Sequence, residues 1–99
     1  AASDVYKRQL QFAPDETTPS LLDGEVFVTG VNTKATAITN FTDAEAGIVY
    51  TIYGNGSENA STIASGGNFV LTKAITLSEG KFIKLAKAAD GKFYEVARG

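Results

Sequence analysis

Short runs of β-branched and aromatic residues recur along the chain from Glu25 onward, with Gly, Asn or Asp turn signals between them. The runs follow one another at about 8–12 residues, a spacing typical of sandwiches, barrels and solenoids built from strands. We therefore predict an all-β fold of about seven to eight short strands, either a small compact sandwich or a short β-solenoid. In order, the runs read EVFVTGV, TKATAITNF, GIVYTIYG, STIAS, NFVLT, AITLSEGKFIKLAK and DGKFYEVARG.

One stretch, KFIKLAKAAD over residues 81–90, is ambiguous between helix and strand. Lys81, Lys84 and Lys87 are spaced three apart, as on the polar side of an amphipathic helix. Gly80 and the Asp90-Gly91 hairpin signal bracket the stretch at strand length, and we predict a strand. No strict repeat of longer period is visible, so the pattern does not choose between sandwich and solenoid.

Residues 1–9, AASDVYKRQ, differ in character from the rest of the chain. The DNA string GCA GCG TCA GAT GTG TAT AAG AGA CAG encodes them, and it resembles the end of the transposase adaptor used in shotgun sequencing libraries. We interpret these residues as adaptor-derived and exclude them from the fold. On this interpretation, and because the sequence has no Met, we expect the chain to be the C-terminal part of a longer protein.

Residues 10–24 have the composition of a linker, with Pro14, Pro19 and the Asp23-Gly24 turn signal among acids and threonines. We predict a linker over 10–24 and one β-rich module over 25–99. A chain of 99 residues has room for one small core. The expected core residues are Ile38, Phe41, Ile52, Ile63, Phe69, Leu71, Ile83, Leu85, Phe93 and Val96.

The composition removes several classes of site and partner. Without Cys or His the chain has no disulfide or thiolate metal site, and it lacks the commonest metal ligand and general base. A net charge of −2 argues against nucleic acid as a partner, and no apolar run is long enough to span a bilayer. A domain this small gains stability from partners when disulfides and metals are missing, so we predict a homo-oligomer.

No residue pattern supports catalysis, and we predict neither an enzyme nor a cofactor. Asn55, Ser57 and Asn59 alternate as the ligands of a calcium loop do, but the twelfth position is Gly66, where an EF-hand has a bidentate Glu. Asn40, Asn55 and Asn59 also begin N-x-S/T sequences. We interpret these segments as turns, because Asn, Gly and Ser form turns readily.

Four aromatic residues suggest a ligand-binding function: Tyr50, Tyr53, Tyr94 and Phe93. Exposed flat rings stack on the apolar faces of sugars, so a row of them would form a glycan-binding platform. Core packing explains the same rings, and both interpretations stay open. Strand alternation puts Tyr50 on one face with Ile52 and puts Tyr53 on the other face.

Three stretches of the chain carry a resemblance to a known family. They are TPSLLDGEVFVTGVNTKATAITNF, AGIVYTIYGNGSENASTIASGGNFVLT and TLSEGKFIKLAKAADGKFYEVARG. In this order they resemble the small β-rich modules at the C-termini of bacteriophage tail fibres, tailspikes and related virion proteins. Phe93 stands where Trp is common in that family, and VARG replaces VSRS. Neither departure touches a catalytic group.

The resemblance implies a compact β-fold that often works within a homotrimer and is joined to upstream virion domains. It predicts a non-catalytic structural module of a phage virion protein, either of tail fibre or tailspike type or capsid-associated. The module would act in folding, assembly or oligomerisation, and its location would be the virion. The alternative hypothesis is a carbohydrate-binding module of a secreted or cell-surface protein. A small enzyme, the third hypothesis, would need two acids that converge in a cleft.

Overall fold

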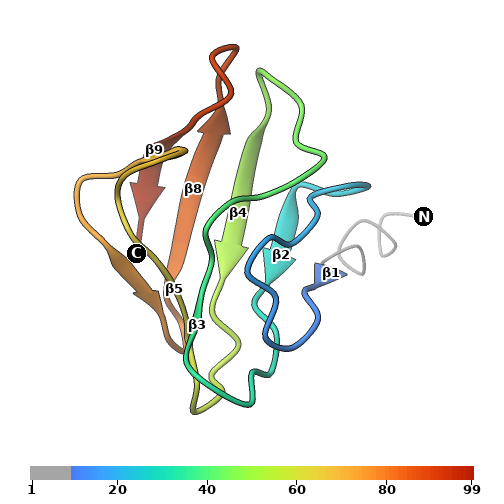
Figure 1. The fold of residues 1–99 in the computed structure, drawn as a ribbon, viewed down its shortest axis with the longest axis vertical. Helices are drawn as coiled ribbons and strands as arrows, with labels where there is room; N and C mark the ends of the chain where they lie inside the picture. Colours follow the sequence, from blue (N-terminus) through green and yellow to red (C-terminus); the bar gives the residue numbers. More distant parts are fainter. Residues whose placement is uncertain (1–9) are drawn as a thin grey trace.

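The computed structural model describes residues 10–99, which form nine short strands and no helix (Figure 1). This confirms the all-β prediction. The interpretation of residues 1–9 as adaptor-derived lies outside the described residues. The strands are β1 Leu10–Gln11, β2 Val26–Val28, β3 Thr36–Ala37, β4 Val49–Tyr53, β5 Ser61–Ile63, β6 Phe69–Val70, β7 Ile75–Leu77, β8 Phe82–Lys87 and β9 Phe93–Arg98.

The strands form two sheets around one core. A six-stranded sheet has the order β1-β2-β4-β8-β9-β6, and a three-stranded sheet has the order β3-β5-β7. Figure 1 shows the large sheet from β1 on the right to β9 on the left, with β3 and β5 crossing in front of it. The small sheet therefore covers one face of the large sheet.

The first half of the chain winds as three parallel coils: the first begins with β1, the second runs from β2 to β3, and the third runs from β4 to β5. Leu10 pairs with Phe27, and Phe27 pairs with Ile52 on the next strand, so each pass of the chain lies beside the one before. The second and third coils are in register in both sheets, because Phe27 pairs with Ile52 and Thr36 with Ser61, each 25 positions apart. This stacking is that of a short solenoid, an arrangement that the sequence pattern had left open beside the sandwich.

The second half of the chain covers the last coil with antiparallel strands. Strand β7 pairs with β5 in the small sheet, while β8 pairs with β4 and β9 with β8 in the large sheet. Residues 81–90 contain strand β8 and the start of the hairpin to β9, as predicted. Ile83 and Leu85 point into the core and Lys84 points away from it, which is strand rather than helix alternation.

The core lies between the two sheets and is rich in aromatic rings. Phe12 stacks on Phe27 with ring centroids 5.3 Å apart, and Phe41 meets Phe93 edge-on at 5.5 Å. Eight of the ten predicted core residues are buried, and Leu71 is half-buried against the core. Val96 is not in the core, since it lies with Tyr94 on the side of β9 that the small sheet does not cover, and it is 57% exposed.

The prediction of a linker over residues 10–24 is wrong. Residues 10–11 form β1 on the edge of the large sheet, and Phe12 N–H donates to the Val28 carbonyl at 2.9 Å. Phe12, Pro19 and Leu21 are buried in the same core as residues 25–99. The first coil is held to the next coil by backbone hydrogen bonds, which do not require apolar side chains. Its prolines and turn residues therefore give it the same composition as a linker.

Polar side chains link the three coils at one corner of the stack. The Asn32 carboxamide oxygen accepts from Asp15 N–H at 2.8 Å, and its Nδ2 donates to the Asn59 carbonyl at 2.8 Å and to Ser61 Oγ at 3.0 Å. Asp15 in turn accepts from the N–H and the hydroxyl of Thr33. One buried amide side chain therefore joins the first, second and third coils.

Candidate functional site: the open face of the large sheet

The large sheet has one face that the small sheet covers and one that it does not, and we call the uncovered face the open face. Its residues alternate with the buried ones along each strand and pair with one another across strands. Tyr53, Thr51 and Val49 of β4 pair with Phe82, Lys84 and Ala86 of β8. The open face consists of Gln11, Val26, Val28, Val49, Thr51, Tyr53, Val70, Phe82, Lys84, Ala86, Tyr94, Val96 and Ala97.

The open face is apolar and nearly free of charge. Lys84 is its one acidic or basic side chain. Among the described residues nine large hydrophobic side chains are exposed, and six of these nine lie on this face. Leu10, Leu22 and Val31 are the other three and lie elsewhere on the coils. Scattered exposed apolar residues are normal in proteins, but their concentration on one sheet face is typical of an interaction surface.

Two of the tyrosines predicted for glycan stacking lie on this face, but far apart. Tyr53 packs against Phe82 with ring centroids 5.5 Å apart. Tyr94 of β9 pairs with Ala86 instead, four residues further along β8, so the two tyrosines are about 13 Å apart along the strands and about 10 Å apart across them. The open face therefore has rings at two ends of β8 and aliphatic side chains between them, and the rings do not form a continuous row.

The other two predicted rings are inside the protein. Tyr50 is only 3% exposed, and its hydroxyl accepts from Glu45 N–H at 2.9 Å. Phe93 is fully buried among the core rings. Tyr50 is therefore no glycan-stacking residue, because the small sheet covers the face of β4 that carries it. Sequence reasoning also missed Phe82, whose place beside Tyr53 depends on the pairing of β4 with β8.

Tyr94 is held in place by a hydrogen bond to the preceding turn. Its hydroxyl donates to Asp90 Oδ2 at 2.6 Å, and Asp90 Oδ1 accepts from Lys92 N–H. This bond raises the pKa of Tyr94 and lowers the pKa of Asp90, because it is strongest between the neutral phenol and the ionised carboxylate. The ring therefore stays uncharged at neutral pH and keeps a fixed position at its end of the open face.

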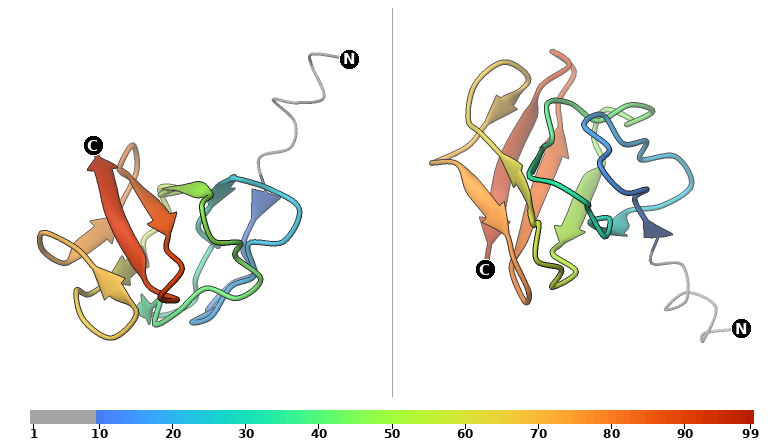
Figure 2. Two further views of the ribbon diagram at one scale, coloured as in Figure 1. Left: turned by 90° about the horizontal axis from the view of Figure 1, so that it is seen from above. Right: turned by 60° about the horizontal axis from the view of Figure 1, so that its bottom comes forward.

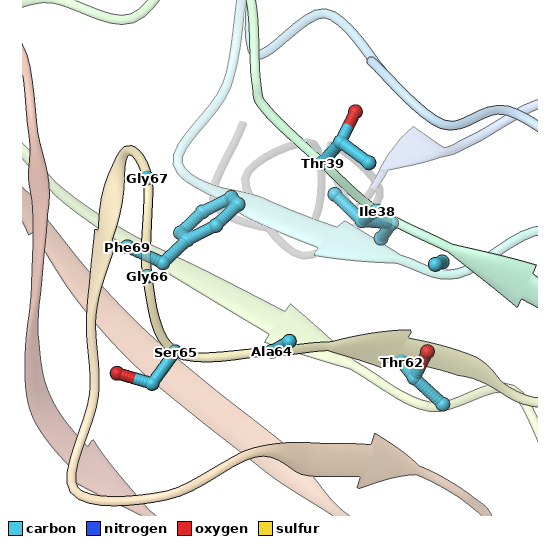
Figure 3. A pocket seen from close by; sticks show the side chains of 9 residues that line it. Ile38, Thr39, Thr62, Ala64, Ser65, Gly66, Gly67 and Phe69 are labelled. Atoms are coloured by element: carbon cyan, nitrogen blue, oxygen red, sulfur yellow. The ribbon is translucent and has the colours of Figure 1, made fainter.

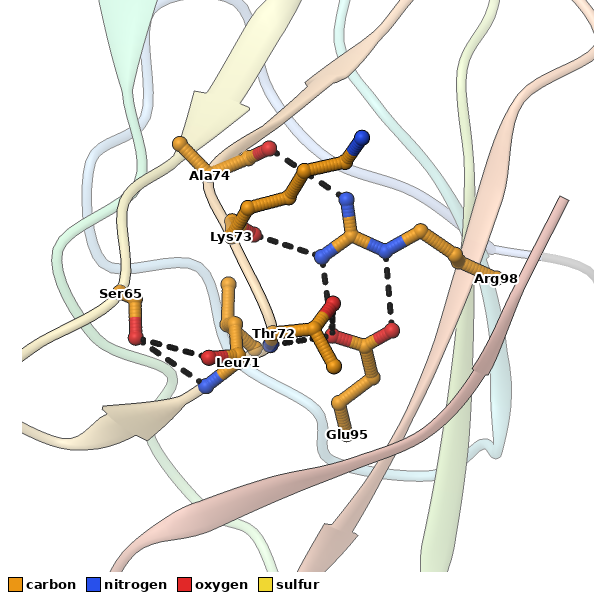
Figure 4. Close-up of polar contacts among 7 residues, drawn as sticks. All are labelled: Ser65, Leu71, Thr72, Lys73, Ala74, Glu95 and Arg98. Carbon is orange, nitrogen blue, oxygen red and sulfur yellow. Dashed lines mark hydrogen bonds and ion pairs between the residues drawn. The ribbon is translucent and has the colours of Figure 1, made fainter.

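An ion pair at the edge of the large sheet links β9 to the segment between β6 and β7 (Figure 4). Arg98 donates from Nε to Glu95 Oε2 at 2.9 Å and from Nη2 to Oε1 at 2.8 Å. Thr72 donates to the same carboxylate through its N–H and its hydroxyl. The bonds from Arg98, with those from Thr72, lower the pKa of Glu95 to about 2. All groups are mutually satisfied, so we assign this cluster to structure rather than chemistry.

A shallow hollow of about 400 Å³ opens where β3 and β5 diverge (Figure 3). The Ile38 N–H still bonds to the Thr62 carbonyl, but Thr39 N–H bonds to Thr17 instead, so the chain leaves β5 there. Buried Ile38 and Phe69 lie at its base. Its lining contains no acidic or basic residue. The pair of converging acids that the enzyme hypothesis requires is not found in this hollow.

The polar loop over residues 54–60 turns several side-chain atoms inward, and two of them, Asn55 Nδ2 and Ser57 Oγ, are buried without a hydrogen-bond partner. Asn55 Oδ1 accepts from Ser57 N–H at 2.7 Å, and Asn59 Nδ2 donates to the Asn32 carbonyl. Asn55 Nδ2 is buried, so neither Asn55 nor Asn59 presents a free amide for glycosylation in the folded chain. Residues 10–99 contain no group of three or more acidic, His or Cys side chains placed to hold a metal ion.

Comparison of the chain with protein-family models, with curated proteins and with solved structures found no match. Over residues 10–99 no helix has the length and the apolar character needed to cross a membrane.

Proposed function

We propose that this chain is a non-catalytic structural module of a phage virion protein, of tail fibre or tailspike type or capsid-associated. It acts in folding, assembly or oligomerisation, with further copies and upstream virion domains as its partners. The observation that carries this proposal is the open face, where six exposed apolar side chains surround a single cation. Such a face is stabilised when another protein surface removes it from water.

The rest of the molecule supports a mechanical role. The coils are bonded by parallel ladders, the corner amide of Asn32 and the ion pair of Glu95 with Arg98. The hydrogen-bonding capacity of these groups is taken up by their contacts with one another. They do not converge on a space that could hold a reacting molecule. The polar side chains therefore hold the backbone in place, and the open face is the part left to make contacts.

A second candidate function is carbohydrate binding by a secreted or cell-surface protein. The observation in its favour is that Tyr53, Phe82 and Tyr94 share the open face. Tyr53 with Phe82 offers one apolar ring pair, and Lys84 lies beside it as an exposed polar group. Sugar faces stack on such rings, while hydroxyl and ammonium groups bind sugar oxygens.

Mass spectrometry of density-banded phage particles, prepared from a sample whose DNA encodes this chain, tests the virion assignment. Peptides of this chain should band with the particles at an abundance comparable to known virion components, while host ribosomal proteins serve as the carry-over control. Peptides confined to the soluble or host-cell fractions would overturn the proposal. A panel of immobilised glycans probed with the folded chain tests the second candidate, which predicts binding that Tyr53→Ala and Tyr94→Ala weaken.

A further inference from the structure

We infer that the open face binds the open face of a second copy of this chain, around a two-fold axis that runs along the strands between β4 and β8. The inference rests on the proposed function only in using the same face. It adds the partner and the relative placement of the two copies. When two sheets with the same handedness of twist pack face to face, their strand directions lie within about 30° of each other and the sheets are about 10 Å apart.

This axis makes the open face complementary to itself. It exchanges the two central strands, so β4 of one copy lies over β8 of the other. Tyr53 then faces Phe82 of the second copy, and the reciprocal contact repeats on the other side of the axis. Each ring already pairs with the other type of ring within its own copy, at 5.5 Å between centroids. The two-fold axis therefore brings four rings into one cluster, which is an arrangement that aromatic side chains favour.

The single cation of the face is also placed well by this axis. Lys84 pairs with Thr51 within each copy, so exchange of β4 and β8 puts Lys84 opposite Thr51 of the second copy. The two Lys84 residues therefore lie on either side of the axis at the same height, about one strand spacing apart and not directly opposite each other, so their charged ends have to turn outward. Their long stems can cover apolar surface while the charged ends reach the rim, as lysines commonly do at interfaces.

The area that the open face could bury is near the lower limit for a specific protein–protein interface. Six strands spaced about 4.8 Å apart and a rise of about 3.3 Å per residue give a footprint on the order of 400 Å² per copy. Interlocking side chains expose more area than their footprint, so two copies bury roughly 1,000 Å² in total, about where specific interfaces begin. We therefore expect a weak dimer that dissociates on dilution. This two-fold arrangement departs from the three-fold one that the family resemblance implies.

Sedimentation equilibrium or light scattering of the full chain over about 1 to 500 μM tests the inference. The mass should rise from 10.4 kDa toward twice that value with concentration. Val49→Lys places a second cation on the central strand of the face and should raise the dissociation constant at least about tenfold. Val31→Lys is the matched control, because Val31 is an exposed valine outside the face, 59% exposed against 41% for Val49. It should leave the dimer unchanged.

Thermal unfolding of both variants shows whether they are folded. Should Val49→Lys prove unstable, Tyr53→Ser provides a second variant on the face, with the same expected loss of the dimer. A chain that stays monomeric throughout, that forms trimers, or that loses its dimer equally in Val31→Lys and Val49→Lys would overturn the inference. None of these results touches the particle experiment, so failure of the dimer and failure of the virion assignment can be told apart.

Discussion

At the scale of single residues, the carboxylate of Glu95 has the densest polar contacts of the C-terminal strand. Four hydrogen bonds reach it, two from Arg98 and two from Thr72. Arg98 also donates to the carbonyls of Lys73 and Ala74, so one charged pair holds β9 against the connection between β6 and β7. This pairing is a local arrangement that strengthens the fold in its ionised form.

The low pKa of Glu95 predicts a loss of stability in acid. Its pKa is about 2 in the folded chain and has its ordinary higher value when unfolded. The ion pair therefore stabilises the fold fully above about pH 5, and this contribution is lost as the pH falls toward 2. Glu95→Gln should lower the melting temperature at pH 7 and make its fall between pH 5 and 2 shallower, as followed by circular dichroism. Parallel curves for the two proteins would contradict this assignment.

Gly54 is a position where the backbone leaves no room for a side chain. A Cβ there would overlap the main-chain carbonyls of Leu77 and Ser78. Gly54→Ala should therefore destabilise the fold by about 2–3 kcal/mol, measured by urea unfolding. Gly24→Ala is the control, since its nearest neighbour is a flexible methyl group of Leu10 at 3.2 Å, and it should cost less than about 1 kcal/mol. Equal effects of the two substitutions would show that the close approach at Gly54 is not limiting.

At the scale of elements, the coils rather than single strands are the building units. Residues 27–38 and 52–63 lie in register, and each segment runs from a strand of the large sheet to a strand of the small one. Their ends, ATAI and ASTI, are similar in sequence, while the corners between differ. Strands of two or three residues gain little by themselves, so the corner contacts between coils carry much of their stability.

Asn32 provides the test of this corner. Its buried side chain bonds to Asp15 in the first coil and to Asn59 and Ser61 in the third. Asn32→Ala leaves these partners unsatisfied and should cost about 2–3 kcal/mol in chemical denaturation. Asn68→Ala is the matched control because Asn68 is exposed and its side chain bonds only to Asn40 at the surface. A similar small loss for both variants would count against the coil-linking role.

At the scale of the whole molecule, a coiled first half and an antiparallel second half share one core. Phe12 stacks on Phe27 and contacts Phe41, which in turn contacts Phe69 and Phe93. The two halves are therefore expected to unfold together in a single cooperative transition. The views in Figure 2 show the coils and the closing strands side by side in one body.

Two adjacent leucines test whether residues 10–24 belong to that body. Leu21 is 2% exposed and lies in the core, whereas Leu22 is 58% exposed. Leu21→Ala should lower the free energy of unfolding by about 2–4 kcal/mol, and Leu22→Ala should change it by less than about 0.5 kcal/mol. Denaturant unfolding of the two variants measures the difference. If this segment were a linker, both substitutions would be harmless.

Alternation along the chain was enough to predict an all-β fold and most of the core, because a strand with one buried face must repeat every second residue. It separated the faces of Tyr50 and Tyr53 correctly, and it predicted the strand around Ile83 and Leu85. The tertiary structure decided three other features. It determined which face of β4 is covered and whether residues 10–24 form a coil or a linker. It also brought Val26, Val49, Phe82 and Tyr94 together on one surface. These features depend on pairing between strands distant in sequence, and a local residue pattern indicates the partner of a strand only where a tight turn joins the two.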